Sequence, residues 1–194
     1  TAPVGGINDS ATLWRKSFDS VPAAAKTEKL DATTLASFGF GSWDAETVRQ
    51  LKGTPGALLV GWDEGVGGSL TTPPFDRDIE KDSALVLRAA KHETKSGALP
   101  VSVISGGVTS RISCVTVSAT PANYIIPLPT LAQGDRILIQ SCTNQNQKTL
   151  VYDLAICATG AYVPESVVTN DASNMTAIQG NAAEVTVPMG DTNL

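Results

Sequence analysis

Apolar and polar residues alternate in short runs through most of the chain, and turn-forming residues separate these runs. In Leu99–Ile104, for example, Val101 and Val103 alternate with Ser102 and fall on one face of an extended strand. The runs follow one another too closely for the helical crossovers that parallel strands need, so the pattern predicts antiparallel pairing. The expected strands are Thr12–Asp19, Ala57–Val60, Leu70–Thr72, Ser83–Ala90, Leu99–Ile104, Ile112–Val117, Tyr124–Leu128, Arg136–Cys142 and Leu150–Cys157.

A glycine-rich stretch between residues 56 and 76 separates an irregular first part of the chain from the regular strands that follow. Ala57–Val60 indicates a buried strand, and the glycines after it supply positive φ at no steric cost in a tight turn. Leu70–Thr72 restarts the strand, which ends at Pro73 and Pro74 because proline cannot donate to a ladder. The patterns together predict an all-β protein, an antiparallel β-sandwich with long irregular loops.

The first part of the chain gives weaker patterns. Residues 22–42 carry small and polar residues and are expected to form a long surface loop, with at most a short helix at Ala23–Lys29. Asp44–Leu51 has a thin apolar edge and is expected to form a short helix. At most short helices are therefore expected in this protein.

The composition changes after Tyr162, which suggests a boundary between residues 1–162, the sandwich domain, and residues 163–194. The later segment begins like a linker and contains one alternating piece, Ala183–Pro188. Two interpretations stay open: a linker that leads into the first strand of a following domain, or an edge strand packed back on this one.

Composition excludes several functional classes. The chain has 194 residues, a formal net charge of −5 and a pI near 4.8, so it lacks the basic patch that nucleic-acid binding requires. No apolar run is long enough to span a membrane. The sequence has no nucleophile elbow and no phosphate-binding loop, and its single histidine, His92, lies in a charged turn. The protein is therefore expected to be noncatalytic.

The three cysteines, Cys114, Cys142 and Cys157, lie in or beside apolar runs. One interpretation makes all three small core residues, because free cysteine is among the most buried residue types. The other makes one disulfide and a spare thiol, with Cys142 and Cys157 as the pair on neighbouring strands.

The order of the predicted strands carries a family resemblance. An aromatic first strand ending in Phe-Asp, Trp14–Asp19, precedes the Leu-Thr-Thr-Pro of Leu70–Pro73, and the last strand contains Tyr152–Ile156. Over residues 12–160 this resembles the jelly-roll domains, similar to galactose-binding-like, MAM-like and cleaved-adhesin modules, of surface and secreted proteins of Bacteroidetes-type bacteria. The resemblance implies an exported or cell-surface jelly-roll module of a longer chain, which binds a glycan or a surface protein.

The resemblance also implies a metal site. In such modules the terminal strands lie side by side and often hold a structural calcium ion, which would place Asp19 and Asp153 together as ligands. Calcium needs six to eight oxygens, so loop carbonyls and waters would have to complete the set. The alternative is a pair of solvent-facing acids that bind no metal.

Aromatic side chains are the candidates for sugar contacts, because flat rings stack on pyranose faces. Trp43, Trp62, Phe75 and Tyr124 are such rings, although the core needs most of the few aromatics present. Trp62 is the leading candidate because Asp63 and Glu64 follow it directly. The expected ligand-binding residues are therefore Trp62, Trp43, Asp63 and Glu64.

Three functional hypotheses follow. The first is a noncatalytic adhesion or carbohydrate-binding module. The second is a structural spacer that positions neighbouring domains. The third is an accessory domain of a secreted glycoside hydrolase or peptidase. Exposed aromatics over a groove would favour the first hypothesis over the second.

Overall fold

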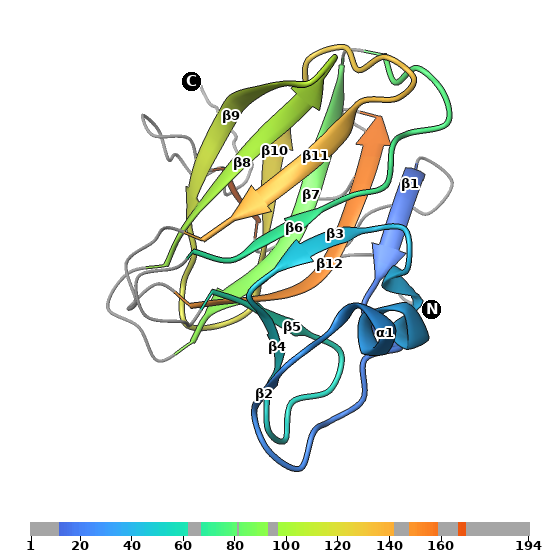
Figure 1. Ribbon diagram of the computed structural model, residues 1–194. Helices are drawn as coiled ribbons and strands as arrows, with labels where there is room; N and C mark the ends of the chain where they lie inside the picture. The colour runs from blue at the N-terminus through green and yellow to red at the C-terminus, as the bar shows by residue number, and fades with distance from the viewer. Residues whose placement is uncertain are drawn as a thin grey trace, which may run out of the picture.

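The computed structural model describes residues 12–61, 67–80, 82–92, 97–141 and 148–158, and the backbone of 167–169. Two β-sheets pack face to face (Figure 1), and this confirms the predicted β-sandwich. The strands are β1 (Thr12–Ser17), β2 (Glu28–Lys29), β3 (Asp44–Glu46), β4 (Val48–Gln50), β5 (Leu58–Val60), β6 (Ser69–Thr71), β7 (Ser83–Lys91), β8 (Ala98–Ser105), β9 (Val108–Thr116), β10 (Ala122–Pro127), β11 (Arg136–Gln140), β12 (Thr149–Ala158) and β13 (Val167–Thr169). The helical segments are α1 (Ala32–Leu35) and the π-helical turn η3 (Ala36–Phe40).

The order of the strands shows jelly-roll topology. Within the described residues the larger sheet has the order β13-β10-β7-β12-β5-β4-β2, and β1 also pairs with β12. The smaller sheet has the order β3-β6-β11-β8-β9. The chain passes from one sheet to the other between consecutive strands from β5 to β12, except at the β8–β9 hairpin, and the resulting sets β5-β12-β7-β10 and β6-β11-β8-β9 have the strand order of two interlocked Greek keys. The jelly-roll expectation is confirmed.

The core lies between the two sheets, where alternate residues of each strand point inward. Leu85 and Leu87 of β7 meet Leu154 and Ile156 of β12 across the ladder, and all four are fully buried. Because the side-chain period of a strand is two, the inward positions of a half-buried strand can be read from its alternation. The larger sheet is also buried on its other face, where Val86 and its neighbours form a second cluster.

Residues 44–51 form two strands, so the predicted helix is wrong. β3 belongs to the smaller sheet and β4 to the larger sheet, and the chain passes between them at Thr47. Thr47 is buried and has a φ of 51°, a conformation that β-branched residues rarely adopt. The turn survives because the Thr47 carbonyl accepts a hydrogen bond of 3.1 Å from the Gly61 N–H. These long-range contacts outweigh the local helical preference.

Residues 22–42 contain more structure than the predicted loop. The expected helix at Ala23–Lys29 does not form, and the helical turns begin at Ala32. Asp31 caps them, since its carboxylate accepts a hydrogen bond of 2.8 Å from the Thr34 N–H. The turns bury Leu35 and Phe40 in the main core, which explains why they form at this place.

The last described segment, β13, pairs in parallel with β10 at one end of the larger sheet. Residues within 163–194 therefore contact the sandwich. Ala183–Pro188 lies outside the described residues, and both interpretations of that piece stay open. Cys142 also lies outside them, so its pairing with Cys157 stays a prediction, whereas Cys157 itself is buried and Cys114 is half-buried on β9. In the described part of the chain no helix has the length and apolar character needed to cross a bilayer.

Candidate functional site

Four aromatic rings form a row along one open side of the sandwich, between β1 of the larger sheet and β3 of the smaller sheet. The ring centroids of Phe40 and Trp43 are 5.3 Å apart, those of Trp43 and Trp14 are 6.0 Å apart, and those of Trp14 and Phe75 are 5.5 Å apart. Phe40 and Phe75 are buried at the two ends of the row. Trp43 and Trp14 are half-buried in its middle. We call these four residues the aromatic row.

The helical turns hold one end of the aromatic row in place. Lys16 of β1 donates a hydrogen bond of 3.1 Å to the Gly39 carbonyl, and its ammonium lies 4.4 Å from the centroid of the Phe40 ring. Burial lowers the pKa of the Lys16 ammonium below its ordinary value. Gly39 has a φ of 91°, which glycine adopts without strain, and a side chain there would collide with Lys16. The contact of β1 with the helical turns therefore fixes the position of Phe40.

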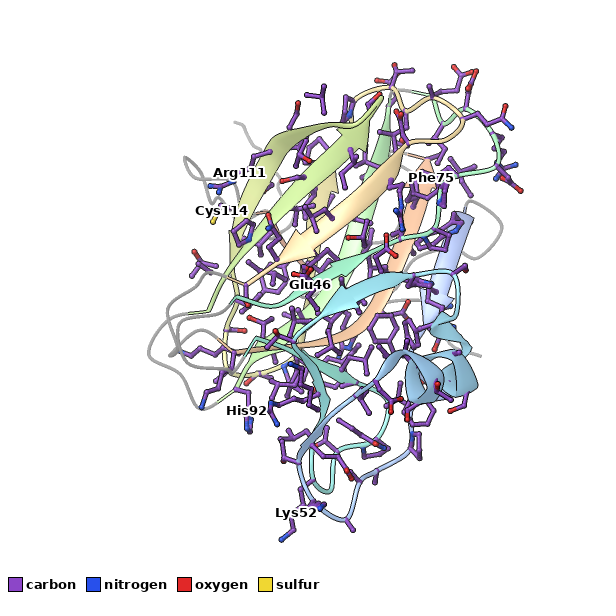
Figure 2. All side chains as sticks on the ribbon, in the orientation of Figure 1. Glu46, Lys52, Phe75, His92, Arg111 and Cys114 are labelled. Atoms are coloured by element: carbon purple, nitrogen blue, oxygen red, sulfur yellow. The ribbon has the colours of Figure 1, made fainter. Side chains whose placement is uncertain are left out.

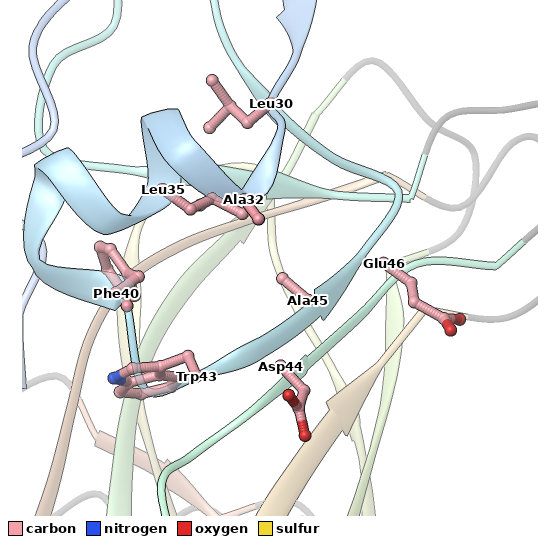
Figure 3. A pocket seen from close by; sticks show the side chains of 9 residues that line it. Leu30, Ala32, Leu35, Phe40, Trp43, Asp44, Ala45 and Glu46 are labelled. Atoms are coloured by element: carbon pink, nitrogen blue, oxygen red, sulfur yellow. The ribbon is translucent and has the colours of Figure 1, made fainter.

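A hollow of about 460 Å³ lies between the helical turns and β3 (Figure 3). This volume falls within the range of about 300–1,000 Å³ that is common for small-molecule sites. Its walls carry Leu30, Leu35, Phe40, Trp43 and Ala45, and Ala32 lies at its edge. We call it the Trp43 hollow.

Two carboxylates stand beside the Trp43 hollow on β3. Asp44 and Glu46 are exposed and alternate with Trp43 and Ala45, so that they leave the strand on the opposite face (Figure 3). Arg136 holds Asp44 through an ion pair of 2.7 Å, in which the Asp44 side chain is 74% exposed. Arg136 also donates a hydrogen bond of 2.7 Å to the Thr72 carbonyl. Acceptors for hydroxyl groups are therefore present at the rim of an apolar hollow.

β3 is also the end strand of the smaller sheet, because it pairs only with β6 in the described part of the chain. An end strand leaves one row of backbone N–H and C=O groups unused by the sheet. On β3 this row faces the side on which the helical turns and the Trp43 hollow lie. Backbone groups and an aromatic ring thus border one space, and the two carboxylates stand beside it on the outer face of β3.

The structure brings one of the four predicted ligand-binding residues to this site. Trp43 lines the hollow, whereas Trp62, Asp63 and Glu64 lie outside the described residues and stay predictions. Of the other candidate aromatics, Tyr124 is 1% exposed and Phe75 is 4% exposed, so both belong to the core.

Sequence reasoning missed several lining residues, namely Leu30, Leu35, Phe40, Asp44 and Glu46. They come from the segments that were predicted as a loop and a helix. The alternation of apolar and acidic residues in residues 43–46 was the sequence signal that could have identified the last two.

Asp19 and Asp153 do lie near one another, but the contacts there do not fit a calcium ion. Ser17, two residues before Asp19, is opposite Asp153 in the ladder between β1 and β12. Arg15 binds the Asp153 carboxylate with its guanidinium at 2.8 Å and 3.4 Å, and thus supplies the positive charge that a metal would bring. The described residues contain no group of three or more metal-ligating side chains. The calcium site stays a prediction, and these contacts argue against it.

Burial sets the protonation behaviour of Asp153. Asp153 is 7% exposed, and this burial raises the pKa of its carboxyl above the ordinary value. The hydrogen bond and the charge of Arg15 oppose this rise, while the nearby Asp19 adds to it. The pair fastens β1 to β12 and is therefore a structural contact.

The sequence matches no protein-family model and no curated protein. Among solved structures, it is similar to CBM29-2, a family 29 carbohydrate-binding module, in a variant complexed with cellulohexaose. The identity is 16%, the TM-score is 0.47, and the match covers 76% of this chain and 92% of that one. It is also similar to PfGH50B, with 9% identity and a TM-score of 0.46, over 62% of this chain and 22% of that one. The likeness is too distant to carry a function across.

Proposed function

We propose that this protein is a noncatalytic carbohydrate-binding module that holds a glycan in the Trp43 hollow. The observation that carries the proposal is a half-buried tryptophan in a hollow bordered by β3, which is an end strand in the described part of the chain and carries two exposed carboxylates beside the hollow. A sugar ring has an apolar face for the indole and hydroxyls for directional hydrogen bonds, so it matches this combination. Trp43 supplies the stacking surface, and Glu46 and Asp44 accept from hydroxyl groups.

The way in which the acids are held supports a noncatalytic role for this site. Glycoside hydrolysis needs two carboxyls that flank the bond to be cleaved, one of them with a raised pKa. Asp44 and Glu46 are exposed on the outer face of β3, and Asp44 is paired with Arg136. Their arrangement suits binding.

The setting we propose is a surface one. The resemblance of the sequence to exported jelly-roll modules supports an exported, cell-surface or secreted protein that uses this domain for adhesion within a longer chain. A test is fractionation of the source cells with an antibody against the domain, combined with protease treatment of intact cells. Protection of the protein inside intact cells would contradict this setting.

The test of the binding site uses a matched pair of substitutions on the helical turns. Ala32 lines the hollow and Ala36 does not, and both alanines are exposed. Leucine at position 32 places extra atoms at the edge of the hollow, whereas the same change at position 36 leaves the hollow open. In an array of soluble polysaccharides and in affinity gels, Ala32→Leu should weaken binding about tenfold, and Ala36→Leu should leave it unchanged.

Glu46→Gln gives a second test that leaves the packing intact. Glu46 is exposed, and the loss of a charged acceptor for a sugar hydroxyl should cost about 1.5 kcal/mol, or about tenfold in affinity. If the wild-type protein binds none of the polysaccharides, the proposal is refuted and a structural spacer is favoured. Binding that Ala32→Leu and Glu46→Gln both leave unchanged would refute this location of the site.

A further inference from the structure

A second hollow lies at the other end of the aromatic row. Its volume is about 320 Å³, and its lining residues are Leu13, Trp14, Phe75, Asp76, Arg77 and Ile79. We call it the Trp14 hollow. The sequence did not place these residues in one site, because Leu13 and Trp14 belong to the first strand and the other four lie about 60 residues further along the chain.

The two hollows are lined by neighbouring tryptophan rings. Trp14 lines one hollow and Trp43 the other, and their rings lie 6.0 Å apart at an angle of 38°. β1, which carries Trp14, and β3, which follows Trp43, are the strands that border this side of the sandwich (Figure 1). Both hollows are therefore next to one pair of half-buried rings.

The Trp14 hollow repeats the chemistry of the Trp43 hollow. Trp14 presents part of an indole ring, and Leu13 adds an exposed apolar side chain, 37% accessible to solvent. Asp76 and Arg77 are exposed at the rim. Arg77 donates one hydrogen bond to the Leu13 carbonyl, which orients a guanidinium that has further donors to offer. An indole, a carboxylate and a guanidinium would suit another sugar unit and its hydroxyls.

We infer that the two hollows are subsites of one extended binding surface, which holds a linear oligosaccharide along the open side of the sandwich. The occupant we assign is the continuation of the glycan chain that fills the Trp43 hollow, because the aromatic row runs without a break from one hollow to the other. This inference rests on the proposed function. It adds that affinity depends on chain length and that Arg77 and Asp76 contact the units beyond the first hollow.

The experiment is isothermal titration calorimetry with two ladders, cello-oligosaccharides and manno-oligosaccharides, from the disaccharide to the hexasaccharide. These β-1,4-linked series have similar extended backbones and differ in the orientation of one hydroxyl group. If the hollows act together, the hexasaccharide of the bound series should bind about tenfold more tightly than its disaccharide. Arg77→Gln should reduce this ratio to about twofold or less, with the disaccharide affinity unchanged.

Arg111→Gln is the matched control, because Arg111 is exposed on β9 on the opposite side of the molecule from Phe75 (Figure 2). It should leave the whole ladder unchanged. Asp76→Asn tests the carboxylate of the Trp14 hollow in the same way and should also act on the long chains only.

The outcomes separate the two proposals. Glycan binding that Ala32→Leu weakens, but that does not strengthen with chain length, would overturn the extended surface and leave the Trp43 hollow as a single site. A length dependence that Arg77→Gln and Asp76→Asn both leave intact would likewise overturn the role of the Trp14 hollow. If neither ladder binds and the polysaccharide array is also silent, the proposed function fails, and the extended surface fails with it.

Discussion

Gly68 packs against the backbone of Gly61 and Thr47, and we predict that Gly68→Ala is among the most destabilising small substitutions in the sandwich. A Cβ atom at this position would lie 2.2 Å from the Gly61 nitrogen, 2.7 Å from the Thr47 carbonyl oxygen and 2.8 Å from the Gly61 Cα. All three are backbone atoms, so no side-chain rotation relieves the collision. The strand that begins after Gly68 must move instead.

The cost can be worked out from the contacts that such a movement breaks. The Gly68 N–H donates to the Ser141 hydroxyl at 2.7 Å, and the Gly68 carbonyl accepts from the Ser141 N–H at 2.8 Å. Loss of two buried hydrogen bonds costs about 2 kcal/mol, and overpacking adds about 1–3 kcal/mol. We therefore expect a loss of about 3–5 kcal/mol in the free energy of unfolding, which is a large share of the stability of a typical domain.

The assay is urea unfolding followed by circular dichroism. Gly106→Ala is the matched control, because Gly106 has a φ of 55° but a Cβ atom there would meet nothing within 4 Å. Its cost is backbone strain alone, about 1 kcal/mol. If Gly68→Ala costs no more than Gly106→Ala, the steric argument is wrong.

Further predictions concern the contacts between strands. Since the folded-state pKa of Asp153 is raised above its ordinary value, the folded protein binds more protons than the unfolded chain between these two pKa values. The stability that this carboxyl contributes is therefore fully present below its unfolded-state pKa and is lost as the pH rises through its folded-state pKa. Asp153→Asn should flatten this part of the dependence of the unfolding free energy on pH, measured by urea unfolding at several pH values. Identical pH dependence in the two proteins would contradict a raised pKa of Asp153. Arg15→Gln should cost about 2 kcal/mol by the same assay, because it leaves the buried carboxylate without its guanidinium; an unchanged unfolding midpoint would show that the pair contributes nothing. Because Arg15 already neutralises Asp153, calcium and chelator should leave the melting temperature unchanged, and a rise with calcium would restore the site predicted at Asp19 and Asp153. Tyr124→Phe should lower the free energy of unfolding by about 1 kcal/mol, because the buried hydroxyl accepts a hydrogen bond of 2.8 Å from the Ser118 N–H. An unchanged melting temperature would refute this prediction.

Local alternation of side chains was enough to identify the long strands. The expected Ser83–Ala90 and Leu150–Cys157 correspond to β7 and β12, which pair over most of their length. A strand presents alternate residues to a core whatever its partner is. The two-residue period of apolar side chains can therefore be recognised from a few consecutive residues. The short spacing between the runs then excluded parallel crossovers, and the sandwich followed.

The segment from residue 22 to residue 51 could not be predicted in the same way. Its strands are two or three residues long, too short for a period to be measured, and both β3 and β4 pair with strands outside the segment. β3 exists because Ser69–Thr71 offers it a ladder, and the turn at Thr47 exists because Gly61 donates to its carbonyl. Local propensity favoured a helix there, and tertiary contacts decided otherwise.

The candidate site, too, could be predicted only in part from the sequence. The sequence alone marked Trp43 as one of a few rings available for a ligand, because aromatic residues are scarce in this chain and recognisable one at a time. Only the tertiary structure placed Trp14 beside it, formed a hollow on either side of the pair, and put carboxylates at both rims. The physical reason is that strand alternation is a local property, whereas a binding surface consists of residues that are close only after two sheets have packed together.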